Sequence, residues 1–196
     1  SILCRKIRQS FDFSRCTEFT VEAGRPDTIT REKLLALREA GISRISINPQ
    51  SLSDQVLKNI GRRHSAQDVL EAFALAKELG FTNINADLIV GLPGDSLESF
   101  QKTLEGVIGL GASNVTVHSL ALKRSARLNA PGGDLSLHAK SEETAAMMDY
   151  SIARLTQEGF EPYYLYRQTR MAGNLENTGW AKPGSICRYN IYTMDE

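Results

Sequence analysis

The sequence has few cysteines, no long apolar run and no excess of charge of either sign. Its three cysteines, Cys4, Cys16 and Cys187, are widely spaced and form neither a disulfide framework nor a CxxC or CxxxCxxC motif. Each is interpreted as a reduced, partly buried thiol. No run approaches the ~20 apolar residues that span a bilayer. We therefore expect a cytoplasmic protein without a membrane partner.

The balance of charge also limits the partners that the chain can recruit. Twenty-three basic residues match twenty-three acidic ones, so no overall field attracts nucleic acid, and no nucleic-acid partner is expected. A local basic site for a small anion remains open. His64, His118 and His138 are scattered, and Walker, GxGxxG and paired-histidine motifs are missing. The sequence therefore predicts no metal site within these residues.

Short β-type runs alternate with helical patterns along most of the chain. Strands are predicted at residues 18–23, 44–48, 83–90, 115–120 and 162–166, and helices at 2–13, 31–40, 53–60, 65–79, 96–110 and 139–158. This rhythm is typical of βα units around a parallel sheet. Five strands are too few for a closed eight-stranded barrel. We therefore predict an α/β fold that is a partial (β/α) TIM-type barrel, truncated on its N-terminal side.

The two ends of the sequence suggest how the fold is divided. The first predicted helix has no strand before it, which suggests that an upstream part of the barrel lies outside this chain. Residues 1–137 are expected to form the C-terminal portion of the barrel. Residues 138–196 are expected to add a helix, an aromatic strand and a C-terminal extension that packs on the barrel.

Polar side chains occur near the ends of the predicted strands, where βα folds carry their chemistry. Glu22 ends the first strand, Gln50 follows the second, Asp87 lies in the third and His118 lies near the end of the fourth. Asp87 could instead be a paired core carboxylate, Glu22 a surface charge and Gln50 part of a turn. Taken together, these residues favour a pocket for a ligand with hydroxyl and amine groups. Arg62 could bind a carboxylate or phosphate of that ligand.

Several motifs in one order carry a resemblance to a known family. They are TVEA at 20–23, RISINPQS at 44–51, IGRRH at 60–64 and NADLIVGLPG at 85–94. They resemble the barrel signature of the oxygen-independent coproporphyrinogen III oxidases and related heme chaperones, which are radical S-adenosylmethionine (SAM) proteins. The segments YYLYRQ at 163–168, GNLEN at 173–177 and AKPG at 181–184 are most similar to the HemZ-type branch.

The resemblance implies an oxidoreductase of heme biosynthesis. In that family three cysteines hold a [4Fe–4S] cluster that binds SAM, and an electron from the cluster cleaves SAM to a 5′-deoxyadenosyl radical. The radical takes a hydrogen atom from a propionate of coproporphyrinogen III, and loss of carbon dioxide leaves a vinyl group. Repetition on a second propionate gives protoporphyrinogen IX. The expected partners are the porphyrinogen substrate and an electron-donor protein.

The resemblance also assigns SAM-binding roles, residue by residue. It implies that Glu22 binds the amino group of SAM or a second SAM, that Gln50 hydrogen-bonds SAM and that Arg62 meets its carboxylate. Asp87 would contact the ribose or the sulfonium region, and Ala121 would line the adenosyl pocket. It assigns no catalytic residue.

Two points leave alternatives open. The CxxxCxxC motif is absent, so either the cluster cysteines lie upstream of Ser1, which we expect, or the protein has lost its cluster. The isolated fragment is expected to hold no cluster and to be inactive. A heme chaperone on the same barrel is the alternative function, which bound heme would distinguish. Arg25, Arg124, Arg127 and Arg167 are candidates for holding the substrate propionates.

Overall fold

A single mixed sheet runs through the molecule. The computed structural model describes residues 2–120, 139–167 and 176–194. The strands are β1 (Thr20–Gly24), β2 (Arg44–Ile47), β3 (Asn83–Val90), β4 (Asn114–Ser119), β5 (Glu161–Tyr166) and β6 (Asn177–Ala181). Their order is β1-β2-β3-β4-β6-β5; β1 to β4 are parallel, whereas β6 is antiparallel to both β4 and β5. The predicted fold class, a partial TIM-type barrel, is confirmed.

The helices connect and cover these strands. They are α1 (Ile2–Ser10), the 3-10 helix η1 (Pro26–Thr28), α2 (Arg31–Glu39), α3 (Asp54–Asn59), α4 (Ala66–Glu78), α5 (Leu97–Gly109), α6 (Ala139–Gln157) and α7 (Arg188–Met194). Thr30, Ser53, Ser65 and Ser96 cap α2, α3, α4 and α5 by accepting a hydrogen bond from the main-chain N–H three residues on. In the described parts of the chain, no helix combines the length and apolarity needed to cross a membrane.

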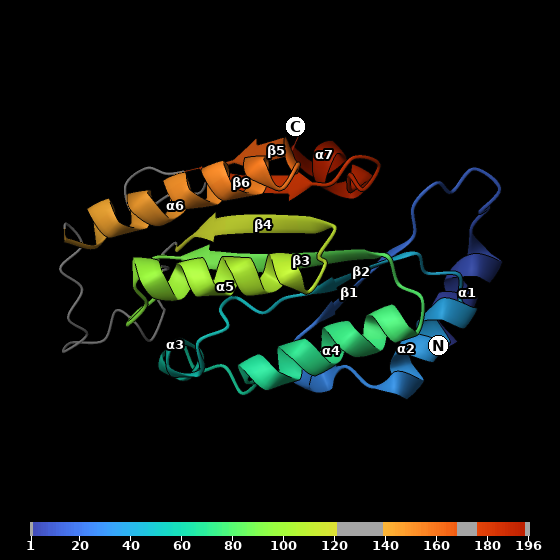
Figure 1. Cartoon of the computed structure of the whole chain (residues 1–196). Helices are drawn as coiled ribbons and strands as arrows, with labels where there is room; N and C mark the ends of the chain where they lie inside the picture. Colours follow the sequence, from blue (N-terminus) through green and yellow to red (C-terminus); the bar gives the residue numbers. More distant parts are fainter. Residues whose placement is uncertain (1, 121–138, 168–175, 195–196) are drawn as a thin grey trace.

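The two faces of the sheet differ in chemistry. In β3, Ile84, Ala86, Leu88 and Val90 are buried, and residues between them are only half-buried. The buried face packs in one core with residues of α4, α5 and α6, which run alongside the strands (Figure 1). The opposite face carries polar side chains such as Asn85 and Asp87. Because side chains alternate along a strand, one polar face is built from every second residue.

Three elements were not predicted from the sequence. They are the short 3-10 helix η1, the five-residue strand β6 with Gly179 at its centre, and α7. Because β6 lies between β4 and β5, the predicted aromatic strand becomes the edge of the sheet. The expected division at residue 137 stays a prediction; α6 packs on α5, and β5 and β6 extend the sheet of the preceding strands.

Candidate functional site: a polar pocket on the open face of the sheet

The polar face of the sheet lines a cavity of about 450 Å³. Residues of the four parallel strands β1 to β4 line it. Strand β5 contributes on one side, and the C-terminal segment that includes the start of α7 forms its floor. Its lining includes Glu18, Thr20, Glu22, Arg44, Ser46, Asn85, Asp87, Thr116, His118, Tyr164, Cys187, Tyr189 and Asn190. The cavity therefore lies along the inside of the partial barrel.

A row of hydrogen bonds connects the two carboxylates that the sequence singled out. Asn48 donates to Oε1 of Glu22 (2.8 Å) and accepts from Ser46 (2.6 Å). Asn85 donates to Ser46 (3.0 Å) and to Oδ1 of Asp87 (2.8 Å). Among described residues, Oε2 of Glu22 and Oδ2 of Asp87 receive no hydrogen bond. Each carboxylate is thus held at one oxygen and keeps the other as an acceptor for a ligand.

Tyrosines of β5 cover this row from the side. The hydroxyl of Tyr164 lies 3.1 Å from Oγ1 of Thr116, and that of Tyr166 lies 2.8 Å from Nδ1 of His118. Burial raises the pKa of Tyr164 and of Tyr166 above the ordinary value for tyrosine. Both phenols therefore stay protonated and can donate hydrogen bonds at neutral pH.

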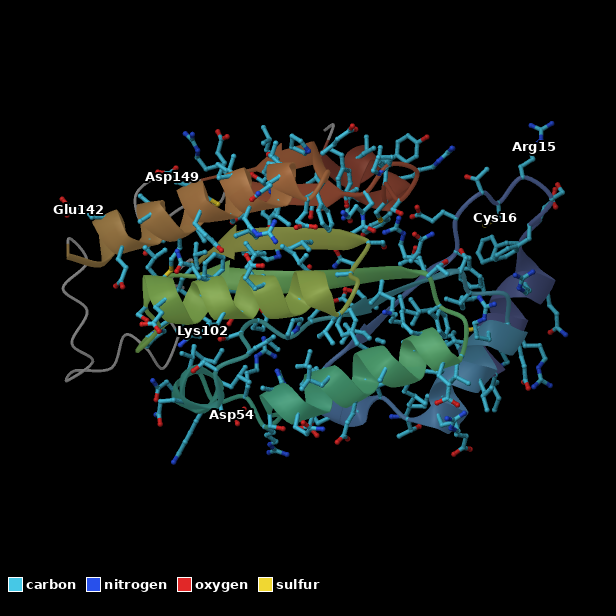
Figure 2. All side chains as sticks on the ribbon, viewed as in Figure 1. Arg15, Cys16, Asp54, Lys102, Glu142 and Asp149 are labelled. Atoms are coloured by element: carbon cyan, nitrogen blue, oxygen red, sulfur yellow. The ribbon has the colours of Figure 1, made fainter. Side chains whose placement is uncertain are left out.

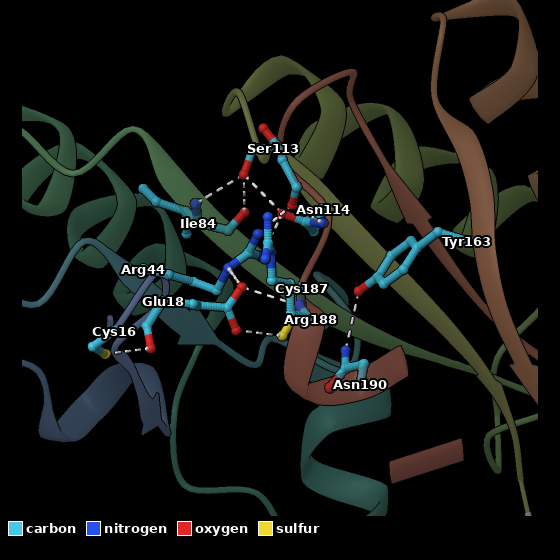
Figure 3. A network of polar contacts seen from close by, with 11 residues as sticks. Cys16, Glu18, Arg44, Ile84, Ser113, Asn114, Tyr163, Cys187, Arg188 and Asn190 are labelled. Carbon is cyan, nitrogen blue, oxygen red and sulfur yellow. Dashed lines mark hydrogen bonds and ion pairs between the residues drawn. The ribbon is translucent and has the colours of Figure 1, made fainter. Parts of the chain in front are cut away.

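A buried arginine, Arg44, connects the segments around the floor of the cavity, and Figure 3 shows its polar contacts. Arg44, 4% exposed, donates to Oδ1 of Asn114 (2.8 Å) and to the carbonyl oxygen of Ser185. Its Nε lies 3.8 Å from Oε2 of Glu18, which also accepts from the main-chain N–H of Arg188 (3.0 Å). The guanidinium is therefore engaged by the protein itself.

The cavity has an excess of acidic groups. Its described lining contains three carboxylates, those of Glu18, Glu22 and Asp87, and one guanidinium, that of Arg44. Burial raises the pKa of the Cys187 thiol, which stays neutral and donates to Oε1 of Glu18 (3.4 Å). Such a lining suits a ligand with cationic groups and hydroxyl donors better than one with several carboxylates.

The predicted SAM-binding residues lie in different places. Glu22 and Asp87 share the cavity. Gln50, buried and with a φ of 66°, follows β2, and its main-chain N–H donates to the carbonyl oxygen of Asp87 (2.9 Å). Arg62 lies between α3 and α4, partly exposed, and does not line the cavity. Ala121 lies outside the described residues.

The arginines considered for substrate propionates do not line the cavity where they are described. Arg25 pairs with Asp27 (3.4 Å), and Arg167 pairs with Glu176 (2.9 Å), both on exposed surface. Arg124 and Arg127, like His138, lie outside the described residues.

Sequence reasoning missed several residues of the site. Arg44, Asn85, Thr116 and Tyr164 were not predicted as lining residues. A signal was available for Asn85 and Thr116, because each lies two positions before a polar residue that was singled out, on the same face of its strand. Nothing local marked Arg44, whose partner Ser185 lies 141 residues away.

The described cysteines do not fit an iron–sulfur cluster. Cys4 and Cys187 are buried, Cys16 is exposed, and all three are free thiols. Residues 2–120, 139–167 and 176–194 contain no group of three or more His, Cys, Asp or Glu side chains placed to hold a metal ion. A cluster would need ligands from elsewhere.

Comparison with known proteins shows what this sequence and fold are similar to. The sequence model of the Radical SAM superfamily matches residues 5–107. The whole chain is 43% identical to the oxygen-independent coproporphyrinogen-III oxidase-like protein HemZ of Bacillus subtilis and covers 39% of it. It is 32% identical to the heme chaperone HemW of the same organism, over 95% of this chain and 45% of that protein.

A solved structure of a radical SAM enzyme has a similar fold. Coproporphyrinogen III oxidase (HemN) from Escherichia coli, described as a radical SAM enzyme, superposes with a TM-score of 0.71 and 25% sequence identity, over 93% of this chain and 39% of that one. The chain thus spans less than half the length of each of these three relatives.

Proposed function

Because the chain belongs to the Radical SAM superfamily, we propose that its polar pocket binds S-adenosylmethionine and that the whole protein is a radical SAM oxidoreductase of heme biosynthesis. Its proposed reaction is the oxidative decarboxylation of two coproporphyrinogen III propionates to vinyl groups. The likeness to HemZ and HemN supports this substrate class. A separate protein is the proposed electron donor.

The pair of half-engaged carboxylates is the observation that carries the proposal. SAM has an ammonium group, a sulfonium centre and two ribose hydroxyls, all of which pair well with carboxylate oxygens. Glu22 and Asp87 share one cavity, and each keeps one oxygen without a partner among the described residues. In this proposal Glu22 takes the amino group and Asp87 takes the ribose or the sulfonium region.

Three further residues complete the proposed SAM site. Gln50 is joined to Asp87 through the main chain and would add an amide contact. Arg62, which lies outside the cavity lining and forms no ion pair with another described residue, is proposed from the family resemblance to bind the SAM carboxylate. Ala121, which lies outside the described residues, is proposed on the same ground to line the adenosyl pocket. When bound, SAM and a [4Fe–4S] cluster supply the radical that begins the reaction. The cluster ligands would lie outside this chain, so the isolated chain is expected to be inactive.

The first test measures SAM binding by the protein with its natural flanking sequence and an anaerobically reconstituted cluster. Replacing either acceptor, as Asp87→Asn or Glu22→Gln, should weaken SAM affinity about 10-fold or more, since a hydrogen bond to a charged group contributes about 1.5–3 kcal/mol. Asp149→Asn is the control, because Asp149 is exposed on the outer side of α6 (Figure 2). Unchanged affinity in both pocket variants would place the SAM site elsewhere.

A heme chaperone is the second candidate. It is favoured by the 32% identity to HemW. The same reconstituted protein distinguishes the two functions. An oxidase converts coproporphyrinogen III and releases 5′-deoxyadenosine, whereas a chaperone retains or transfers heme and leaves coproporphyrinogen unchanged. A full cluster without 5′-deoxyadenosine would remove the oxidase proposal.

A further inference from the structure

We infer that His118 and Tyr166 are positioning residues for Asp87: they form a directed chain of polar contacts, from Tyr166 through His118 to Oδ1 of this carboxylate, that leaves Oδ2 for the ligand. The inference rests on the proposed function, in which Asp87 contacts SAM. It adds two residues from β4 and β5 that act through Asp87 rather than on the ligand.

The chain of contacts crosses the sheet diagonally, because Asp87 lies opposite Thr116, two residues before His118 on β4. The hydroxyl of Tyr166 lies 2.8 Å from Nδ1 of His118, and Nε2 of His118 lies 3.8 Å from Oδ1 of Asp87. The side chains of His118 and Asp87 are 24% and 23% exposed, so water competes only partly for these contacts. On its other side, Oδ1 of Asp87 accepts from Asn85 (2.8 Å). Oδ1 therefore accepts one hydrogen bond, from Asn85, and faces the His118 ring at a distance that suits electrostatic attraction rather than a hydrogen bond.

The chemistry of the groups sets the direction of the chain. Asp87 carries a negative charge and can only accept hydrogen bonds, so electrostatics favour the neutral tautomer of His118 that has its hydrogen on Nε2, toward Asp87. In the neutral ring Nδ1 is then an acceptor, and Tyr166 must donate to it. Burial and the nearby Asp87 raise the pKa of Tyr166, while a hydrogen bond with Asn177 lowers it. The net effect keeps the phenol protonated, as a donor requires.

Tyr164 of β5 can reach β4 because β6, the strand between β5 and β4, has no side chain at one position. Gly179 of β6 lies opposite both Thr116 and Tyr164, and a Cβ atom at Gly179 would overlap the Tyr164 ring. The rings of Tyr164 and Tyr166 are stacked, with centroids 6.2 Å apart and planes 4° apart. Tyr164, bound to Thr116, therefore supports Tyr166 in its approach to His118.

A double-mutant cycle separates positioning from simple bracing of the fold. SAM affinity would be measured by calorimetry on the reconstituted full-length protein, for Tyr166→Phe, for Asp87→Asn and for the double variant. Tyr166→Phe alone should weaken SAM about 5-fold, the equivalent of one neutral hydrogen bond of about 1 kcal/mol. In the Asp87→Asn background the same change should have almost no further effect, because the chain then has no carboxylate to position. His118→Gln, which keeps a donor, should lose less affinity than His118→Ala.

Tyr150→Phe is the matched control. Tyr150 also loses a hydroxyl that is hydrogen-bonded to a carboxylate, in this case Oε1 of Glu105 (2.8 Å), but it lies on α6 outside the cavity. It should leave SAM affinity unchanged. If Tyr166→Phe binds SAM like the wild type, or if its loss adds fully to that of Asp87→Asn, the inference is wrong even though the SAM site stands.

A measurement without SAM tests the chain of contacts between Tyr166, His118 and Asp87 in the wild-type protein. Nitrogen-15 NMR should find the His118 ring protonated at Nε2 and bare at Nδ1, with the resonance assigned by its loss in His118→Gln. A proton on Nδ1 of the neutral ring would overturn the direction of the chain. If the wild type binds no SAM at all, the proposed function fails and the positioning role fails with it, while the tautomer still reports whether the chain exists.

Discussion

Gly179 shows how a single missing side chain allows the polar site to form. Tyr164 lies over this residue on its way to Thr116, and the space that a methyl group would need is occupied by the phenol ring. Glycine is therefore required at position 179 for a steric reason: it lets the Tyr164 side chain of β5 cross the neighbouring strand β6.

Gly179→Ala should therefore destabilise the protein and weaken SAM binding together. We expect a loss of about 1–3 kcal/mol in the free energy of unfolding, the usual range for overpacking a filled site. Gly109→Ala is the control, because a Cβ at this exposed position in α5 meets nothing within 4 Å and alanine favours helix. Urea unfolding of both variants gives the comparison, and equal stability of Gly179→Ala and wild type would contradict the steric argument.

At the scale of elements, α4 begins with a reciprocal pair of hydrogen bonds. Ser65 accepts from the main-chain N–H of Asp68 (3.2 Å), and Asp68 accepts from the main-chain N–H of Ser65 (2.6 Å). The main-chain N–H of Ser65 above all, and then the Ser65 hydroxyl, which donates to Oδ2 of Asp68 (2.7 Å), lower the pKa of Asp68 below 3.8. A carboxyl group with a lowered folded-state pKa stabilises the protein above its unfolded-state pKa, and this contribution is lost as pH falls through the folded-state pKa.

Asp68→Asn should thus destabilise the protein at neutral pH and have a smaller effect in acid. At pH 7 the expected loss is about 0.3–1 kcal/mol, the contribution of a negative charge in the first turn of a helix. The difference from wild type should shrink steadily as pH falls below about 3.8, the unperturbed value. Urea unfolding from pH 7 down to pH 2.5 measures it. A difference that stays constant with pH would show that the charge of Asp68 is not what stabilises α4.

The elements that the sequence predicted are those whose signals are local. The strand at residues 83–90 has the predicted bounds, and Thr30, Ser53 and Ser65 cap the predicted helices. Strand β6 was missed because its centre is Gly179, and its pairing with β4 and β5 is a tertiary effect. Glycine has low strand propensity, so a five-residue run around it gives no clear pattern.

In the candidate site, too, the residues with a local sequence signal were predicted, and those that depend on distant contacts were not. Glu22 and Asp87 were found because a charged residue in a strand is conspicuous, and the structure brings both into one cavity. The engagement of Arg44 could not be found, because it depends on side chains and carbonyl groups far along the chain. Arg62 was expected beside the carboxylates, and the described fold places it outside the cavity lining.

At the scale of the whole molecule, Arg44 joins segments from both ends of the chain. Glu18 precedes β1, Arg44 begins β2, Asn114 begins β4, and Ser185 belongs to the segment before α7 (Figure 3). The side chain of Arg44 is 5% exposed and that of Glu18 is 16% exposed, so little water compensates either charge. Removing Arg44 takes the counter-charge away from the largely buried Glu18 and one hydrogen-bond donor away from Asn114 and Ser185.

Arg44→Met should consequently be among the most destabilising single changes in the molecule. The methionine fills part of the same volume but removes the counter-charge of Glu18, and it removes one of the two donors to Oδ1 of Asn114 and to the carbonyl oxygen of Ser185. We expect a loss of about 3–5 kcal/mol. Arg31→Met removes an ion pair with Glu78 in which both side chains are more than half exposed, and it should change stability by less than about 1 kcal/mol. Urea unfolding compares the two, and amide hydrogen exchange should show faster exchange at residues 185–190 in Arg44→Met alone. Because Arg44 holds the floor under the cavity, SAM affinity should fall with it; a variant that loses stability yet keeps a protected floor would show that α7 is held by other contacts.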